Sequence, residues 1–151
     1  MPSSASEPPS LIVRSGLRIT GRARLNDFAG TLQRRVTGGR PFTCLLTGDE
    51  ELRRLNRRFR RMNKATDVLS FPSAAPAGDL GDIAVSLDQA RAQARQFGHR
   101  VGDELCILML HGVIHLLGMD HETDGGEMAR TELVWRKKLR LPSGLIERVS
   151  P

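Results

Sequence analysis

The sequence predicts an α+β domain in which a small mixed sheet of about four strands is surrounded by about five helices. Short apolar segments are interspersed with longer segments in which apolar residues recur every three or four positions. They do not follow the strict strand–helix–strand alternation of a doubly wound sheet, which favours the α+β class. The chain has 151 residues, 39% hydrophobic and 26% charged. This size supports one globular domain with a real core and excludes disorder as its main state.

Four segments have the composition of strands. They are short and apolar, and they cover residues 11–13, 41–47, 67–71 and 81–86. Gly, Pro or Asp bounds the last three of them. Only an Ala/Pro/Gly loop at 72–78 separates the last two. We therefore expect these two strands to pair antiparallel.

Five segments have the spacing of helices, and they cover residues 26–36, 50–62, 88–97, 101–117 and 126–139. Asn26 and Asp88 are the expected N-caps. Gly98 and Gly118 are expected to end the helices that precede them. The segment 101–117 is apolar nearly all round, which predicts that it is the central helix.

Basic residues are concentrated in one half of the chain. The net charge is +6, but residues 1–64 carry +9 and residues 65–151 carry −3. The excess of Arg suits bidentate phosphate contacts, although a GC-rich coding bias also produces it. The helix at 50–62 combines an expected core stripe of Leu52, Leu55, Phe59 and Met62 with six Arg on its other faces. Coding bias does not explain that concentration, so an anion-binding face is favoured.

The ends of the chain and its cysteines indicate a cytoplasmic protein without membrane contact. Residues 1–10 have the composition of a disordered tail, and we expect one domain over 11–151. The tail has no basic segment followed by an apolar one, and the apolar stretch at 105–119 is too short and too polar to span a bilayer. Cys44 and Cys106 lie in apolar runs without CxxC spacing and are expected to be buried and reduced.

The sharpest motif is the sequence HGVIHLLGMDH at 111–121. On a helix, His111 and His115 are four residues apart, so both imidazoles project from one face. Gly118 can leave the helix in a left-handed conformation and turn the chain so that His121 supplies a third nitrogen. Three His ligands leave a fourth position open, as in a catalytic zinc site.

The motif therefore predicts one Zn²⁺ per chain, held on a zincin-like helix by His111, His115 and His121. Zinc lowers the pKa of bound water toward ~7, which makes hydroxide available at neutral pH. His99 has no partner at ligand spacing and is expected to be an ordinary buried or surface residue. A nearby carboxylate can orient an imidazole or act as a general base. The sequence offers several candidates and leaves open whether any of them has such a role: Asp82, Glu104, Asp120, Glu122 and Asp124.

A peptidase is one interpretation of the histidine pattern. The skeleton H-x-x-x-H-x-x-G-x-x-H is that of the metzincin peptidases, which place a Glu directly after the first His as general base. Here that position is Gly112. Without this carboxylate the usual machinery for peptide hydrolysis is incomplete.

Three motifs together resemble the YbeY family of metal-dependent endoribonucleases. They are Leu55-Asn56 through Arg60, the segment TDVLSFP at 66–72 followed by Gly81-Asp82-Ile83, and HGVIHLLGMDH. The resemblance implies a bacterial, cytoplasmic, zinc-dependent hydrolase that cleaves single-stranded RNA in 3′-end maturation of small-subunit rRNA and in ribosome quality control. It also implies a mixed sheet with surrounding helices. Ala65 departs from the family's usual Pro, which should only soften a turn.

The resemblance assigns the three histidines to the metal and Arg60 to the active-site groove. By helical geometry, Arg60 also lies beside the apolar stripe, on the flank that it shares with Arg53 and Arg57. A guanidinium there can offset charge on the nonbridging phosphate oxygens. The expected catalytic residues are Arg60 and His111. The expected RNA contacts are Arg53, Arg57 and Arg60. Arg54 and Arg61 fit a solvated charge run.

A zinc metallopeptidase and a non-catalytic ribosome-assembly factor that binds rRNA both fit parts of the pattern, although structural zinc usually recruits Cys. Attack by zinc hydroxide would leave a 3′-hydroxyl and a 5′-phosphate, whereas attack by the 2′-hydroxyl would leave a cyclic phosphate.

Few aromatic residues are available for base stacking. RNA binding is therefore expected to have a weak sequence preference and a steep dependence on salt. The resemblance suggests small-subunit ribosomal proteins and an Era-like GTPase as partners.

Overall fold

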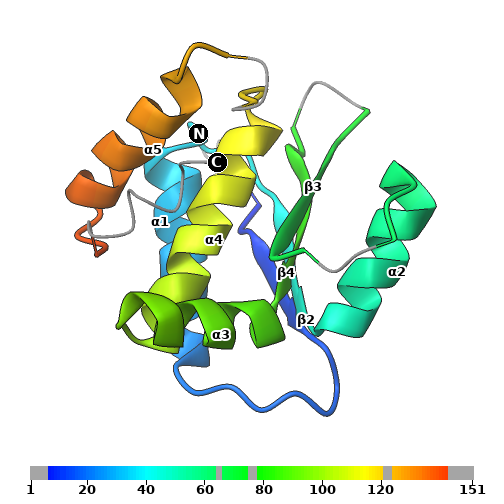
Figure 1. Cartoon of the computed structure of the whole chain (residues 1–151). Helices are drawn as coiled ribbons and strands as arrows, with labels where there is room; N and C mark the ends of the chain where they lie inside the picture. Colours follow the sequence, from blue (N-terminus) through cyan, green and yellow to red (C-terminus); the bar gives the residue numbers. More distant parts are fainter. Residues whose placement is uncertain (1–6, 64–65, 75–77, 121–123, 143–151) are drawn as a thin grey trace.

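Four strands form one mixed sheet in the order β1–β2–β4–β3 (Figure 1). The computed structural model describes residues 7–63, 66–74, 78–120 and 124–142. Within them the strands are β1 (Ser10–Val13), β2 (Thr43–Thr47), β3 (Val68–Pro72) and β4 (Gly81–Ser86). β2 pairs in parallel with β1 and with β4, whereas β3 pairs antiparallel with β4. The expected antiparallel pair and the α+β class are confirmed.

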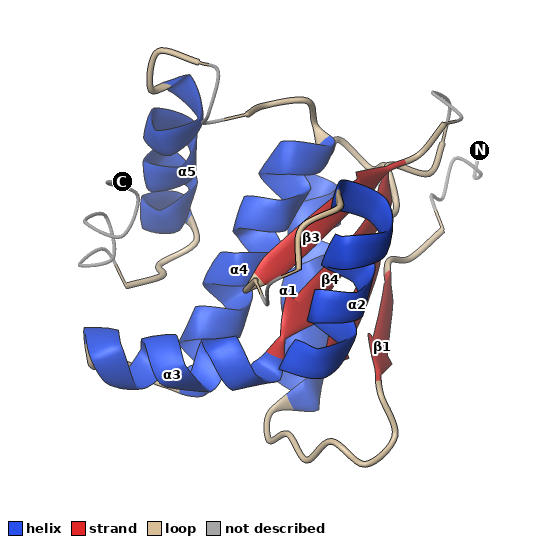
Figure 2. Ribbon diagram, turned by 45° about the vertical axis from the view of Figure 1, so that its right-hand side comes forward, coloured by secondary structure: helices blue, strands red, loops and turns tan. Residues whose placement is uncertain are grey.

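The described part of the chain contains five helices, as the sequence predicts. They are α1 (Arg22–Arg35), α2 (Asp49–Arg60), α3 (Leu87–Phe97), α4 (Val101–Leu116) and α5 (Glu127–Lys138). Figure 2 shows α2 on one face of the sheet and α4 on the opposite face, with α1, α3 and α5 around α4. None of the described helices is long and apolar enough to cross a bilayer.

The side chains of β4 alternate between the two layers. Ile83 and Val85 belong to the main core beneath α4, whereas Ala84 lies in a smaller cluster with Leu52 of α2 and Leu69 of β3. α4 is buried over most of its length, which confirms its central position. The two faces of β4 therefore pack against α2 on one side of the sheet and against α4 on the other.

Two expected N-caps are wrong. α1 begins at Arg22, four residues before Asn26, because the buried face of the helix already includes Leu25. At the start of α3, Ser86 is the N-cap, since its hydroxyl accepts a hydrogen bond from the backbone of Gln89. The carboxylate of Asp88 instead accepts from the backbone amide of Asp49 and so ties α3 to the start of α2.

The end of α2 also differs from the expected core stripe. The helix ends at Arg60, and Arg61 adopts a left-handed conformation at φ 56°. Phe59 is 57% exposed and Met62, beyond the helix, is 39% exposed. The apolar cluster on this face is small and covers the first turns of α2, where Leu52 is fully buried and Leu55 packs beside it. Phe59 reaches only the edge of the cluster, where its ring meets that of Phe71.

The tail is shorter than expected. β1 begins at Ser10, and the backbone carbonyl of Glu7 accepts a hydrogen bond from the side chain of Gln33 at 2.6 Å. Residues 7–10 therefore lie against the domain, while residues 1–6 lie outside the described part of the chain. Cys44 and Cys106 are buried free thiols, as expected, and burial raises the pKa of each to about 12.

Candidate active site

The last turns of α4 present two histidines on one side of the helix. The ring centroids of His111 and His115 are 5.0 Å apart, with 69° between the ring planes. Both side chains are partly exposed, although the residues between them are buried. α4 ends at Leu116, and Gly118 takes the expected left-handed conformation at φ 98°. The predicted convergence of the first two imidazoles is thus present, while His121 lies outside the described residues.

A buried ion pair from α5 lies against His111. The Nδ1 atom of His111 is 2.5 Å from Oε1 of Glu132, and Arg136 donates a hydrogen bond to Oε2 of the same carboxylate. Glu132 and Arg136 are each only 2% exposed. Burial by itself would raise the pKa of Glu132, but the hydrogen bond and charge of His111, together with Arg136, hold that pKa below its usual value.

Sequence reasoning missed Glu132, although a signal for it exists. The expected apolar stripe of α5 runs through Met128, Trp135 and Leu139, and Glu132 lies on it, four residues after Met128 and four before Arg136. An acidic and a basic residue at this spacing within a buried stripe indicate a buried ion pair. What the sequence does not reveal is that the pair faces α4 at His111.

The carboxylates that the sequence singled out have other surroundings. Glu104 bonds to Nε2 of His99 at 2.7 Å near the start of α4, about two turns from His111. His99 is thus a satisfied, mostly buried residue, as expected. Asp82 shares a face of β4 with Ala84, which packs toward α2 rather than α4. Burial and the charge of Asp79 raise the pKa of Asp82.

Two more of these carboxylates lie beyond α4, where the chain turns toward α5. Asp124 accepts hydrogen bonds from the backbone amides of Gly126 and Met128, so it caps the start of α5. Asp120 is partly buried and lies two residues after Gly118. Glu122 lies outside the described residues. Among the described residues there is no group of three or more metal-ligating side chains, since the third expected ligand is not among them.

Gly112 is packed directly against the sheet. A Cβ at this position would lie 3.0 Å from Cγ2 of Ile83 and 3.1 Å from Cγ2 of Val68. The hydroxyl of Ser70 donates a hydrogen bond to the backbone carbonyl of Gly112 at 3.0 Å. The position that carries the general base in the metzincin pattern therefore faces β3 and β4 and has no room for a carboxylate.

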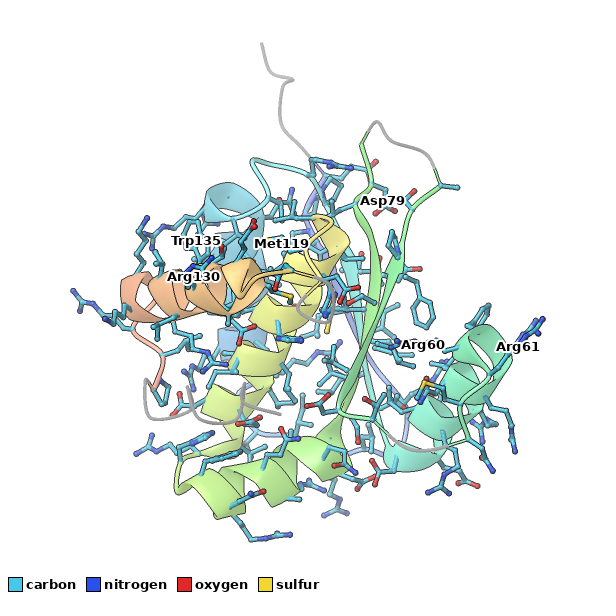
Figure 3. The ribbon with its side chains drawn as sticks, turned by 45° about the horizontal axis from the view of Figure 1, so that its top comes forward. Arg60, Arg61, Asp79, Met119, Arg130 and Trp135 are labelled. Carbon is cyan, nitrogen blue, oxygen red and sulfur yellow. The ribbon has the colours of Figure 1, made fainter. Side chains whose placement is uncertain are left out.

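The arginines of the expected RNA contacts are exposed on α2. Arg53, Arg57 and Arg60 are all exposed, and Arg60 is the last residue of the helix. In Figure 3, Arg60 points from α2 toward the strand pair, whereas Arg61 points away from it. The start of α2 is fixed to α3, because Asp49 accepts hydrogen bonds from Ser86 and Gln89.

The histidine pair and Arg60 lie on different sides of the edge strand β3. Both α2 and α4 contact β3, and no described hydrogen bond or ion pair joins Arg60 to either histidine. α2 follows β2 directly and runs back along the sheet, and α4 runs in the same sense (Figure 1). The C-terminal ends of the two helices consequently flank the same end of β3. The structure thus brings the two predicted halves of the site to one edge of the molecule.

The fold and these side chains define a class: a small α+β protein with paired histidines at the end of its central helix, supported by a buried carboxylate. The chain belongs to the YbeY family, because the family model described as Endoribonuclease YbeY matches residues 26–139. The resemblance stated from the three sequence motifs is therefore confirmed.

Individual relatives agree with this assignment. "Endoribonuclease YbeY" of Solibacter usitatus is 57% identical over 146 residues, covering 97% of this chain and 98% of the relative. The protein of the same name from Nautilia profundicola is 56% identical over 126 residues, covering 83% and 87% of the two chains. The solution structure of TM1509 from Thermotoga maritima matches with a TM-score of 0.57 and 27% identity, over 92% of this chain and 88% of that one.

Proposed function

We propose that this chain is a cytoplasmic, zinc-dependent endoribonuclease that hydrolyses single-stranded RNA and matures the 3′ end of small-subunit rRNA. Endoribonuclease is the activity named for relatives that are 56–57% identical and match most of the chain. The observation that carries the proposal is the pair of His111 and His115 on one side of α4, with Glu132 behind His111.

The donors present fit zinc. Imidazole nitrogen suits Zn²⁺, whereas Mg²⁺ and Ca²⁺ prefer oxygen ligands. A carboxylate that bonds to the second nitrogen of a ligating histidine is common in zinc sites, and Glu132 has this relation to His111. We assign His111, His115 and His121 as the ligands of one Zn²⁺ per chain. When bound, zinc supplies a Lewis acid that activates water for attack on phosphorus.

The chain's own residues bind and orient the RNA. Arg60 points toward the strand pair at the end of α2, where its guanidinium can contact a phosphate bidentately. Arg53 and Arg57 extend the cationic surface along α2. An RNA backbone that crosses the end of β3 would meet Arg60 on one side and the histidines on the other. We therefore assign Arg60 the role of offsetting charge on the nonbridging oxygens of the phosphate.

Peptide hydrolysis is disfavoured by the packing of Gly112. The metzincin base would have to occupy a position where any Cβ would lie 3.0 Å from Cγ2 of Ile83. A peptidase would need its base from elsewhere on the chain. The test is casein hydrolysis by the zinc-loaded protein, and cleavage that disappears in His111→Ala would establish a peptidase instead.

The central experiment compares RNA cleavage by zinc-loaded wild-type protein with cleavage by His115→Ala and Arg60→Ala. His99→Ala and Arg61→Ala are the matched controls, since His99 bonds to Glu104 and Arg61 points away from the strands. We expect cleavage of single-stranded but not duplex RNA, lost in the first two variants and retained in the controls. Binding of RNA without cleavage in every preparation would show a non-catalytic assembly factor.

The chemistry of the products and the partners belong to the same proposal. Attack by water predicts a 3′-hydroxyl and a 5′-phosphate, and end-group analysis of a cleaved oligonucleotide decides this point. A cyclic phosphate would contradict water attack.

The proposed partners are the rRNA and proteins of the small ribosomal subunit and an Era-like GTPase. Co-purification with small subunits from a strain that carries His115→Ala, which should bind without cleaving, tests this association.

A further inference from the structure

We propose that Glu132 is a positioning residue, which holds His111 as the Nδ1–H tautomer and thereby leaves the Nε2 lone pair to ligate the metal. This inference rests on the proposed zinc site and names the residue that prepares it. Glu132 would not touch the substrate or the metal. It would act through His111, with Arg136 holding the carboxylate in place.

The hydrogen bond determines where the imidazole proton lies. An ionised carboxylate has only acceptor oxygens, so Nδ1 of His111 must be the donor across the 2.5 Å contact with Oε1 of Glu132. A neutral imidazole carries one proton, which leaves the lone pair on Nε2. The contact also restricts rotation of the ring, since Glu132 is buried on α5 and cannot follow it.

Arg136 holds the carboxylate of Glu132 in place. Its guanidinium donates to Oε2, so the two carboxylate oxygens are divided between Arg136 and His111. Because Arg136 and Glu132 are both buried, this second hydrogen bond fixes the direction in which the carboxylate faces His111. The Glu132–Arg136 pair on α5 therefore orients His111 on α4.

A second contact between a histidine and a carboxylate lies at the start of α4, where Glu104 of the helix meets His99 in the segment before it. His99 contacts Glu104 through Nε2, with both side chains buried and away from the HxxxH pair. Glu132 differs because it bonds to Nδ1 of His111, which belongs to the predicted ligand motif and lies one turn from His115. The His99–Glu104 pair thus provides an internal comparison at the opposite end of α4 from His115.

The first test is ¹⁵N NMR of the histidine rings in metal-free, full-length protein, with His111 assigned from the signals that His111→Gln lacks. We expect wild-type His111 to show a protonated Nδ1 and an unprotonated Nε2. In Glu132→Gln we expect a mixture of tautomers, because an amide can donate as well as accept. A protonated Nε2 in the wild type, or an unchanged tautomer in Glu132→Gln, would overturn the proposal without any appeal to activity.

The second test is the dissociation constant for zinc, measured by competition with a chromogenic chelator. Glu132→Gln should weaken zinc binding about 10–100-fold. Glu127→Gln removes the same charge from an exposed position on the same helix and should leave the constant unchanged. If Glu132→Gln does not fold, Glu132→Asp retains the charge but withdraws the oxygen from His111, and the same weakening is expected.

These measurements separate the two proposals. If wild-type protein binds no zinc, or if His115→Ala binds zinc as tightly as the wild type does, the proposed zinc site is refuted and this inference is refuted with it. If zinc is lost in His115→Ala but the Glu132 variants keep the wild-type constant, only the role of Glu132 is refuted. Restoration of affinity by Arg136→Lys relative to Arg136→Met would support the role assigned to Arg136.

Discussion

The hydroxyl of Ser70 in β3 donates a hydrogen bond to the carbonyl of Gly112 in α4, between the two histidines of the site. This bond and the close approach of Gly112 to Ile83 hold the histidine-bearing turn of α4 directly against the sheet. The glycine is therefore a packing residue, which places His111 and His115 at a set height above β3 and β4.

Gly112→Ala should destabilise the fold, although alanine is the better helix former. The added Cβ would meet side chains of Ile83 and Val68 that are themselves packed, and overpacking of this kind costs about 1–3 kcal/mol of unfolding free energy. Urea denaturation measures the change. Gly102→Ala in the same helix is the control, because its new Cβ would meet only the end of the Arg24 side chain, and it should gain up to ~1 kcal/mol. Equal effects at both positions would refute this account.

Truncation along the apolar stripe of α2 should have very unequal effects. Leu52 is fully buried, and Leu52→Ala should cost about 2–5 kcal/mol. Phe59 is 57% exposed and touches only Phe71 and the guanidinium of Arg58 among the described ring contacts, so Phe59→Ala should cost less than about 1 kcal/mol. Urea denaturation of the two variants measures both values. A loss at Phe59 as large as that at Leu52 would show that the sheet covers the end of α2.

The contribution of Glu51 to stability should disappear in acid. A hydrogen bond from Arg14 lowers the pKa of Glu51 to about 2, against the opposing effect of burial. Because the folded-state pKa lies below the unfolded value of about 4.3, the stabilisation is complete above that pH and is lost as the pH falls toward 2. The difference in unfolding free energy between wild type and Glu51→Gln should shrink across this range. Glu50→Gln, exposed in the same first turn of α2, is the control for the loss of one negative charge from the start of the helix.

Both thiols should resist modification in the folded protein. Burial raises the pKa of Cys44 and Cys106 to about 12, so little thiolate exists at pH 8. A chromogenic disulfide reagent at pH 8 should therefore react slowly with native protein and rapidly with both cysteines in denaturant. Fast reaction of either thiol under native conditions would show that the core around it opens readily.

RNA binding should depend steeply on salt through the arginines of α2. Each phosphate contact removed should reduce the slope of log affinity against log salt by about 0.7 for a single strand. Arg57→Gln and Arg60→Gln should each do so, whereas Arg61→Gln, directed away from the strands, should leave the slope unchanged. Fluorescence anisotropy with a labelled oligonucleotide at several salt concentrations measures the slope. A slope near zero in the wild type would exclude binding through the phosphate backbone.

Local patterns predicted most of the fold. The segment at Gly81–Ser86 is a strand with the predicted bounds, and the glycine signals at Gly98 and Gly118 correspond to left-handed backbone conformations. The start of α1 was harder to predict, because Asn26 is a good N-cap in sequence while Leu25 is buried as part of the helix. Burial of one apolar side chain outweighed a local capping preference, which is a tertiary effect.

By itself, the sequence determined that His111 and His115 share one face of a helix, since their spacing and the helical period are local properties. It also determined that the arginines gather on α2. Only the tertiary structure decided which carboxylate contacts His111. Glu132 is 21 residues from His111 and reaches it because α5 packs on α4, whereas the nearer Glu104 is occupied by His99. Proximity in sequence does not determine contact between helices, because the packing of apolar faces sets which polar side chains are buried together.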